Sequence, residues 1–143
     1  MVAYADSSFL VSLYAQDAHT AKAQAWFKKH PYPLILTPFS KAEAQHALRM
    51  TCFRRLITEA ELSQCLLTFE QDQAEGLFEP MSLDTTALFQ KTSQLSHRYA
   101  LNHGVCYLDT IHVASALLTK STHFLTFDDR QAKLAEVVGL STQ

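Results

Sequence analysis

The sequence is poor in the residues that divide a chain into separate parts. Glycine occurs three times and proline four times in 143 residues, so we expect no long flexible linker. This length corresponds to about one domain, and a chain of this size can bury a core without disulfides or structural metal. We therefore expect a single domain over residues 1–143.

Cysteine is also scarce and shows no ligand spacing. The three cysteines, Cys52, Cys65 and Cys106, are odd in number and form no CxxC pair. This argues against a disulfide framework or a zinc site and favours free thiols in a reducing compartment. The first residues show no basic start followed by an apolar run, and no stretch approaches the roughly 18 apolar residues of a membrane span. We expect a cytoplasmic protein with no signal peptide and no membrane segment.

The chain lacks an excess of positive charge. It has 12 Lys and Arg against 14 Asp and Glu, for a formal net charge of −2. A strongly basic nucleic-acid-binding protein would look different. Any contact with a polyanion must therefore be local, or must be mediated by a bound cation.

Short apolar segments alternate along the chain with segments of helical pattern. Strands are expected at residues 2–5, 34–37, 77–81 and 123–127. Helices are expected at residues 9–14, 18–30, from 40 onward, 58–75, 84–104, 110–119 and 128–139. Ser40 with Glu43, and Thr58 with Glu61, match the capping-box spacing at a helix start. This alternation predicts an α/β fold in which helices cover both faces of a central, mostly parallel sheet.

Four acidic residues fall near the ends of predicted strands or the starts of helices. Asp6 and Asp128 each end a strand, Glu43 begins the helix after the second strand, and Asp109 opens a later helix. Ligands of open parallel sheets bind outside the carboxyl ends of the strands. Oxygen-only ligands suit Mg²⁺ or Mn²⁺ rather than zinc, and a cation would relieve the repulsion among gathered carboxylates.

A purely structural interpretation of the same acids stays open. Asp and Ser are favoured at helix N-caps, so acids after strands are expected even without a metal. From the residues alone, an acidic metal site and a set of helix caps are both possible.

Other charged residues near these acids are weaker candidates. Arg49, Arg54 and Arg55 follow Glu43, and Arg130 follows Asp128. They could hold phosphate groups of a polyanion, since arginine suits bidentate phosphate contact, or they could form a solvated surface. His112, three residues after Asp109, is interpreted as a core or capping histidine in preference to a metal or phosphate contact.

Four segments resemble the PIN-domain family, and in particular its VapC-like toxin ribonucleases. The most specific are Asp109 followed by His112 and an alanine-rich helix, and a strand ending in Thr126, Phe127 and Asp128. The likeness runs in the family's order through the segments Tyr4–Leu10, Thr37–Glu43, Leu108–Ala116 and Leu125–Asp128.

The resemblance implies a fold, a site and partners. The fold would be a three-layer α/β/α arrangement with a central sheet of four to five strands, the fifth being very short and drawn from residues 140–143. Asp6, Asp109 and Asp128 would contact Mg²⁺ or Mn²⁺, and Glu43 would act largely through water. Ser7 and Thr126 would orient the site. Family members commonly cut RNA, form homodimers and are silenced by a small cognate antitoxin.

The sequence is compatible with three functions. The first is a metal-dependent endoribonuclease that is the toxin of a toxin–antitoxin pair. The second is a housekeeping nuclease of the same fold that acts in RNA processing. The third is a module that binds RNA or protein without cutting. Because all four acids are present, we rank the third hypothesis last.

Overall fold

The computed structural model of the protein describes all 143 residues and contains five strands and seven helices. The first half of the chain forms β1 (Ala3–Ala5), α1 (Ser7–Tyr14), α2 (Thr20–Lys29), β2 (Leu34–Leu36), α3 (Pro38–Phe53) and α4 (Glu59–Ala74). The second half forms β3 (Phe78–Pro80), α5 (Thr85–His103), α6 (Tyr107–Leu118), β4 (His123–Leu125), α7 (Asp129–Val137) and β5 (Ser141–Thr142). No helix has both the length and the apolar character needed to cross a membrane.

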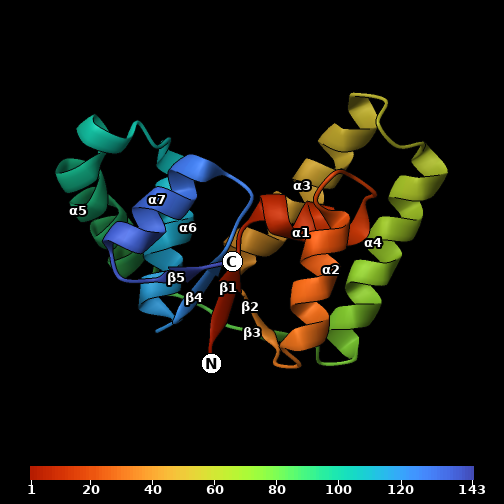
Figure 1. Ribbon diagram of the computed structural model, residues 1–143, viewed down its shortest axis with the longest axis horizontal. Coiled ribbons are helices and arrows are strands. Elements are labelled where there is room, and N and C mark those ends of the chain that lie inside the picture. Colours follow the sequence, from red (N-terminus) through yellow and green to blue (C-terminus); the bar gives the residue numbers. More distant parts are fainter.

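All five strands are parallel and lie in the order β3-β2-β1-β4-β5 (Figure 1). In the central strand, Ala3 lies opposite Leu34 of β2 on one side and His123 of β4 on the other. The chain builds the sheet outward from β1 to β3 and then returns to the other side of β1. The strand order therefore reverses between β1 and β4, the place where ligands of open α/β sheets bind.

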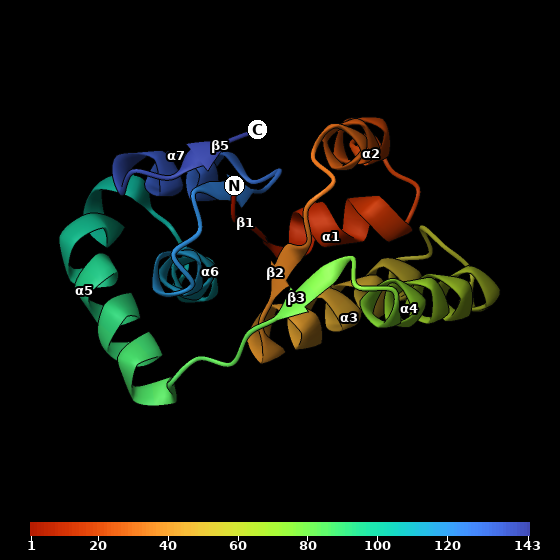
Figure 2. The ribbon, with the colours of Figure 1, turned by 90° about the horizontal axis from the view of Figure 1, so that it is seen from below.

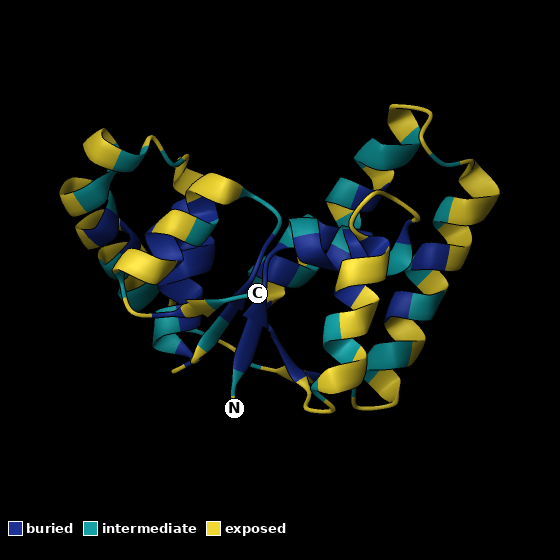
Figure 3. Ribbon diagram, viewed as in Figure 1, coloured by how far each residue is buried: buried dark blue, intermediate teal, exposed yellow.

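Alternate residues of each strand face two separate cores. Ala3 and Ala5 belong to a core shared with α1, α2, α3 and α4, whereas Tyr4 faces a core shared with α5, α6 and α7. Figure 2 shows these two groups of helices on opposite sides of the sheet. Buried residues concentrate in the strands and on the inner helix faces (Figure 3). The predicted three-layer α/β fold is confirmed, and so is its very short fifth strand.

One of the two predicted capping boxes is confirmed. The Thr58 hydroxyl accepts from the backbone N–H of Glu61 at 3.2 Å, and the Glu61 carboxylate accepts from the backbone N–H of Thr58 at 2.7 Å. This reciprocal pair satisfies two of the free N–H groups at the start of α4.

The capping box predicted at Ser40 and Glu43 is wrong. Thr37 caps α3 and Ser40 is its reciprocal partner, because Pro38 starts the helix two residues earlier than expected. The fixed φ of proline suits the first helical position, where its missing N–H is not needed. Glu43 therefore lies in the second turn of α3 and is free for other contacts.

The helix that carries Asp109 also begins earlier than predicted. α5 ends at His103 and is followed by Gly104, whose φ of 58° is the left-handed conformation that glycine adopts at helix ends. α6 then starts at Tyr107 rather than Thr110, with Cys106 as its N-cap. Asp109 consequently lies in the first turn of α6, instead of preceding the helix.

Candidate functional site

Asp6 lies where β1 meets α1, directly at the reversal of strand order. It is fully buried and acts as the N-cap of α1. Its Oδ1 accepts hydrogen bonds from the backbone N–H of Phe9 at 2.9 Å and from the Ser8 hydroxyl at 2.7 Å. Its Oδ2 accepts from the Thr126 hydroxyl at 2.6 Å and from Nε2 of Gln131 at 3.0 Å. Four donors, two from α1, one from the residue after β4 and one from α7, thus hold one carboxylate.

The charged form of Asp6 is unfavourable despite these hydrogen bonds. Burial raises the pKa of Asp6 above its ordinary value, while the charge of His112 and the hydrogen bonds from Thr126, Phe9 and Ser8 act in the opposite direction. Burial prevails because all four donors in contact with the carboxylate are uncharged. A cation beside Asp6 would therefore stabilise its charged form.

Asp128 follows β4 and caps α7. Its Oδ1 accepts from the backbone N–H groups of Arg130 at 2.8 Å and Gln131 at 2.9 Å. Its own N–H donates to the Thr126 hydroxyl at 3.0 Å, so the same hydroxyl contacts both Asp6 and the backbone of Asp128. The loop is joined to α1 by the N–H of Phe127, which donates to the Ser8 hydroxyl at 2.9 Å. These bonds fix the carboxyl ends of β1 and β4 against each other.

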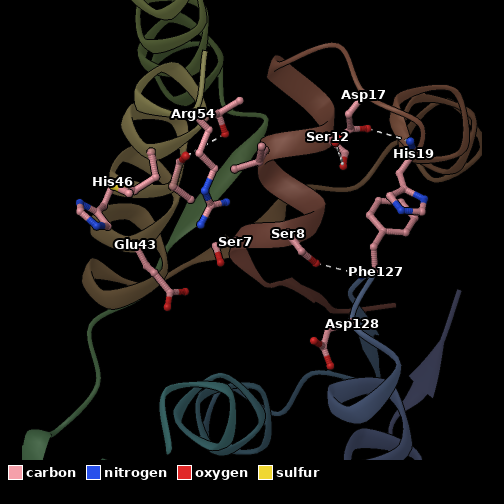
Figure 4. A pocket seen from close by; sticks show the side chains of 14 residues that line it. Ser7, Ser8, Ser12, Asp17, His19, Glu43, His46, Arg54, Phe127 and Asp128 are labelled. Carbon is pink, nitrogen blue, oxygen red and sulfur yellow. Dashed lines mark hydrogen bonds between the residues drawn. The ribbon is translucent and has the colours of Figure 1, made fainter. Parts of the chain in front are cut away.

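A groove with a volume of about 670 Å³ opens above this junction (Figure 4). Glu43 and Asp128 stand on opposite sides of it, with Ser7 and Ser8 of α1 between them. Arg54, at the end of α3, extends its guanidinium group into the same space. With Asp17, Ser12 and Thr51, which also line it, the groove combines three carboxylates, four hydroxyls and one permanent cation.

Glu43 reaches the groove from α3, and its carboxylate accepts a hydrogen bond from a buried histidine. Oε2 of Glu43 accepts a hydrogen bond from Nε2 of His112, and Nδ1 of His112 lies 2.9 Å from the Tyr4 hydroxyl. Partial burial acts to raise the pKa of Glu43, but the hydrogen bond and charge of His112 outweigh it, with smaller help from Ser7 and His46. The pKa of Glu43 is therefore held below its ordinary value, and the carboxylate stays ionised at neutral pH.

The predicted site residues are only partly brought together. Ser7, Glu43, Arg54 and Asp128 line the groove. Asp6 and Thr126 lie beneath it, buried and hydrogen-bonded to each other. The remaining candidates do not line the groove, namely Asp109, Arg49, Arg55 and Arg130. Asp109 is half-buried, and the three arginines are exposed.

The acids have the right chemistry for a hard divalent cation, but the side chains do not form a coordination shell as they stand. The 143 residues contain no group of three or more His, Cys, Asp or Glu side chains placed to hold one ion. Both oxygens of Asp6 are already bonded within the protein, and Asp128 caps α7. The carboxylate donors and the uncompensated burial of Asp6 fit such a cation. The four-acid metal site therefore stays a prediction.

Sequence reasoning missed two partners of Asp6 and the bond between Glu43 and His112. Ser8 had a local signal, because a hydroxyl two residues after an N-cap Asp is well placed to bond its carboxylate. Gln131 had none, since it lies 125 residues from Asp6. Only the pairing of β1 with β4 brings those two side chains together.

Comparisons with known proteins identify a family and several similar folds. A family model described as PIN domain matches residues 3–137. No curated protein is similar enough in sequence to match the chain.

Three solved structures share the fold at low sequence identity. VapC20 of Mycobacterium tuberculosis, described as a Sarcin-Ricin loop cleaving toxin, has a TM-score of 0.69 and 14% identity, over 92% of this chain and 94% of that one. FitAcB of Neisseria gonorrhoeae has a TM-score of 0.67 and 15% identity, over 99% and 96%. PAE2754 of Pyrobaculum aerophilum has a TM-score of 0.58 and 16% identity, over 99% and 83%. At such identities these likenesses establish the fold alone.

Proposed function

Because the chain belongs to the PIN domain family, we propose that it is a Mg²⁺- or Mn²⁺-dependent endoribonuclease that hydrolyses phosphodiester bonds of RNA. The observation that carries this proposal is the junction of β1 and β4. There a buried Asp6 lies beneath a groove walled by Glu43 and Asp128, at the point where the strand order reverses.

The residues have distinct roles in this proposal. Asp6, Asp109 and Asp128 would hold the cation, which requires Asp109 to approach from the first turn of α6. A bound divalent cation would supply positive charge for the phosphodiester and for oxygens that gain charge in the transition state. Ser7 and the Thr126 hydroxyl would orient the carboxylates, and ionised Glu43 would orient a water in the groove.

RNA would be held in the groove partly by Arg54, whose guanidinium group can contact two phosphate oxygens at once. Arg49, Arg55 and Arg130 would contact only RNA that extends beyond the groove. We further propose that the protein is the toxin of a type II toxin–antitoxin pair, forms a homodimer, acts in the cytoplasm and is silenced by a small cognate antitoxin. The description of VapC20, which has a similar fold, as a Sarcin-Ricin loop cleaving toxin supports the toxin role.

The test of the enzymatic proposal is cleavage of a labelled RNA with and without a divalent cation. We expect cleavage with Mg²⁺ or Mn²⁺, none with EDTA, and loss of cleavage in Asp6→Asn and Asp109→Asn. Equal cleavage by wild type and both variants would show that the activity does not come from these residues. Failure of every RNA tested to be cut would contradict the proposal.

The toxin step has its own test. Expression of the wild-type protein without a partner should arrest growth, and Asp6→Asn should relieve the arrest. Normal growth on expression of a protein that cleaves RNA in vitro would favour a housekeeping nuclease in RNA processing.

The lack of a preformed group of three metal-ligating side chains favours a second candidate function. In this alternative the protein binds RNA or protein without cutting, and Asp6 and Asp128 serve only as helix caps. Calorimetric titration with Mn²⁺ separates the two, because only the nuclease requires binding that Asp6→Asn abolishes.

A further inference from the structure

His112 is a buried residue that connects the interior of the protein to the wall of the groove. Only 1% of its surface is exposed, and it lies one turn after Asp109 on α6. Its Nε2 contacts Oε2 of Glu43 on α3, and its Nδ1 lies 2.9 Å from the hydroxyl of Tyr4 on β1. Three side chains from three different elements thus form one hydrogen-bonded chain.

The chemistry of the partners fixes the direction of these hydrogen bonds. An ionised carboxylate can only accept a hydrogen bond, so Nε2 of His112 must carry a proton and donate a hydrogen bond to Glu43. In the neutral imidazole Nδ1 is then an acceptor, and the Tyr4 hydroxyl donates to it. A phenol keeps its proton at neutral pH, so this hydroxyl is a donor to the neutral ring. When His112 carries the charge that lowers the pKa of Glu43, Nδ1 donates to the Tyr4 hydroxyl instead, so in both states Tyr4 holds the ring with Nε2 toward Glu43.

Aromatic packing restricts the orientation of the imidazole. The Phe39 ring lies 4.7 Å from the His112 ring, centroid to centroid, and the Tyr4 ring lies 5.8 Å away. Tyr4 is itself stacked on Phe124 of β4 at 5.9 Å. A hydrogen bond from a fixed ring in apolar surroundings is stronger than one made in water.

The exposure of the two bonded partners is unequal. The Glu43 side chain is 23% exposed and lines the groove, whereas His112 is 1% exposed and does not. One carboxylate oxygen is thus held from inside the protein while the group still faces the groove.

We propose that His112, oriented by Tyr4, is a positioning residue that fixes the Glu43 carboxylate in the groove for RNA cleavage. This inference rests on the proposed nuclease function, in which Glu43 orients a water. His112 itself touches neither the groove nor the substrate.

Two substitutions of His112 distinguish the hydrogen bond made by Nε2 from the one made by Nδ1. In His112→Gln the side-chain amide nitrogen reaches about as far as Nε2, so it can still donate to Glu43. In His112→Asn the amide reaches only as far as Nδ1 and cannot. We expect His112→Asn to lower kcat about 10- to 100-fold, the usual effect of removing a residue that orients a site, with little change in KM. His112→Gln should recover most of that loss.

The decisive measurement is a double-mutant cycle with Glu43→Gln, assayed with enzyme in excess so that slow cleavage can be followed. If His112 acts through Glu43, adding His112→Asn to Glu43→Gln should change the rate less than about twofold. Unfolding free energies of the same four proteins provide a second cycle that needs no activity. Additive effects in either cycle would overturn the proposal.

Val113→Ala is the matched control for a structural effect. Val113 is the next residue on α6, is fully buried in the core that Tyr4 faces and does not line the groove. We expect it to lower stability but leave kcat unchanged. If it lowers kcat as much as His112→Asn does, the role of His112 is merely structural. Wild-type protein that cuts no RNA overturns the proposed function, whereas active wild type with unchanged kcat in His112→Asn overturns only the positioning role.

Discussion

Among single residues, Asp6 has the clearest conflict between stability and function. Its carboxylate is completely buried and accepts four hydrogen bonds, yet no charged donor contacts it. Hydrogen bonds reduce the free-energy cost of burying a charge but do not remove it. Such a residue is expected where a protein keeps a reactive group at the expense of stability.

Asp6→Asn should therefore stabilise the metal-free protein while it abolishes cleavage. The amide nitrogen that replaces Oδ2 cannot accept from Thr126 or Gln131. The Thr126 hydroxyl can rotate to accept instead, and a flip of the Gln131 amide would present its Oε1, which is buried and has no hydrogen-bond partner. We expect the free energy of unfolding at neutral pH to rise on the order of 1 kcal/mol. Denaturant titration in EDTA measures this change.

Asp129→Asn is the control for the loss of one negative charge. Asp129 directly follows Asp128 and is exposed in the first turn of α7. Its substitution should change stability by less than about 0.5 kcal/mol. A loss of stability in Asp6→Asn would show that the bonds to the carboxylate outweigh the cost of its burial.

The pH dependence of stability provides a second measurement at Asp6. The folded protein holds the Asp6 proton more tightly than the unfolded chain does, because the pKa is raised on folding. The penalty for the charged form is complete above the folded pKa and disappears as the pH falls toward the ordinary pKa. The stability advantage of Asp6→Asn over wild type should therefore shrink as the pH is lowered. An advantage that grows on acidification would contradict the raised pKa.

Among the elements, α3 is the helix whose N-terminal cap lies close in sequence to a groove residue, Glu43. Thr37 caps the helix, and Glu43 lies in its second turn. Thr37→Ala should cost about 1 kcal/mol of stability through loss of the cap. It should also lower kcat, because the first turns of α3 orient Glu43. Unfolding and cleavage are measured on the same preparation.

Thr58→Ala is the matched variant for this prediction. It also removes a threonine from a capping box, but at the start of α4, where Thr58 and Glu61 are exposed and outside the groove. We expect it to lower stability and leave cleavage unchanged. Equal loss of cleavage in both variants would mean that general stability, rather than the position of Glu43, controls the rate.

The elements also show where sequence patterns succeed. Strands ending just before Asp6 and near Asp128 were predictable, because short apolar segments alternate with helical segments. The start of α3 was not, since the spacing of Ser40 and Glu43 satisfies a rule that Pro38 overrides. The partners of Asp6 and Glu43 could not be predicted either. Thr126 is 120 residues from Asp6, and His112 is 69 residues from Glu43.

For the molecule as a whole, both the net charge and the charge of the groove oppose the binding of a polyanion such as RNA. The chain carries a formal charge of −2, and the groove lining includes Asp17, Glu43 and Asp128. Arg54 is the one Lys or Arg in that lining. Arg49 lies on the same helix but is exposed outside the groove. Sequence alone could not separate these two arginines, because the rotation of α3 decides which one faces the groove.

Arg54→Ala should weaken RNA binding and change its dependence on salt. Each phosphate contact with single-stranded nucleic acid contributes about 0.7 to the slope of log K against log salt concentration. Loss of one such contact should reduce the magnitude of the slope by about that amount. Arg49→Ala, which removes the same charge outside the groove, should leave the slope nearly unchanged. Binding is measured by fluorescence anisotropy in EDTA at several salt concentrations. Equal reductions in both variants would mean that the overall field of the protein, and not the groove, holds the RNA.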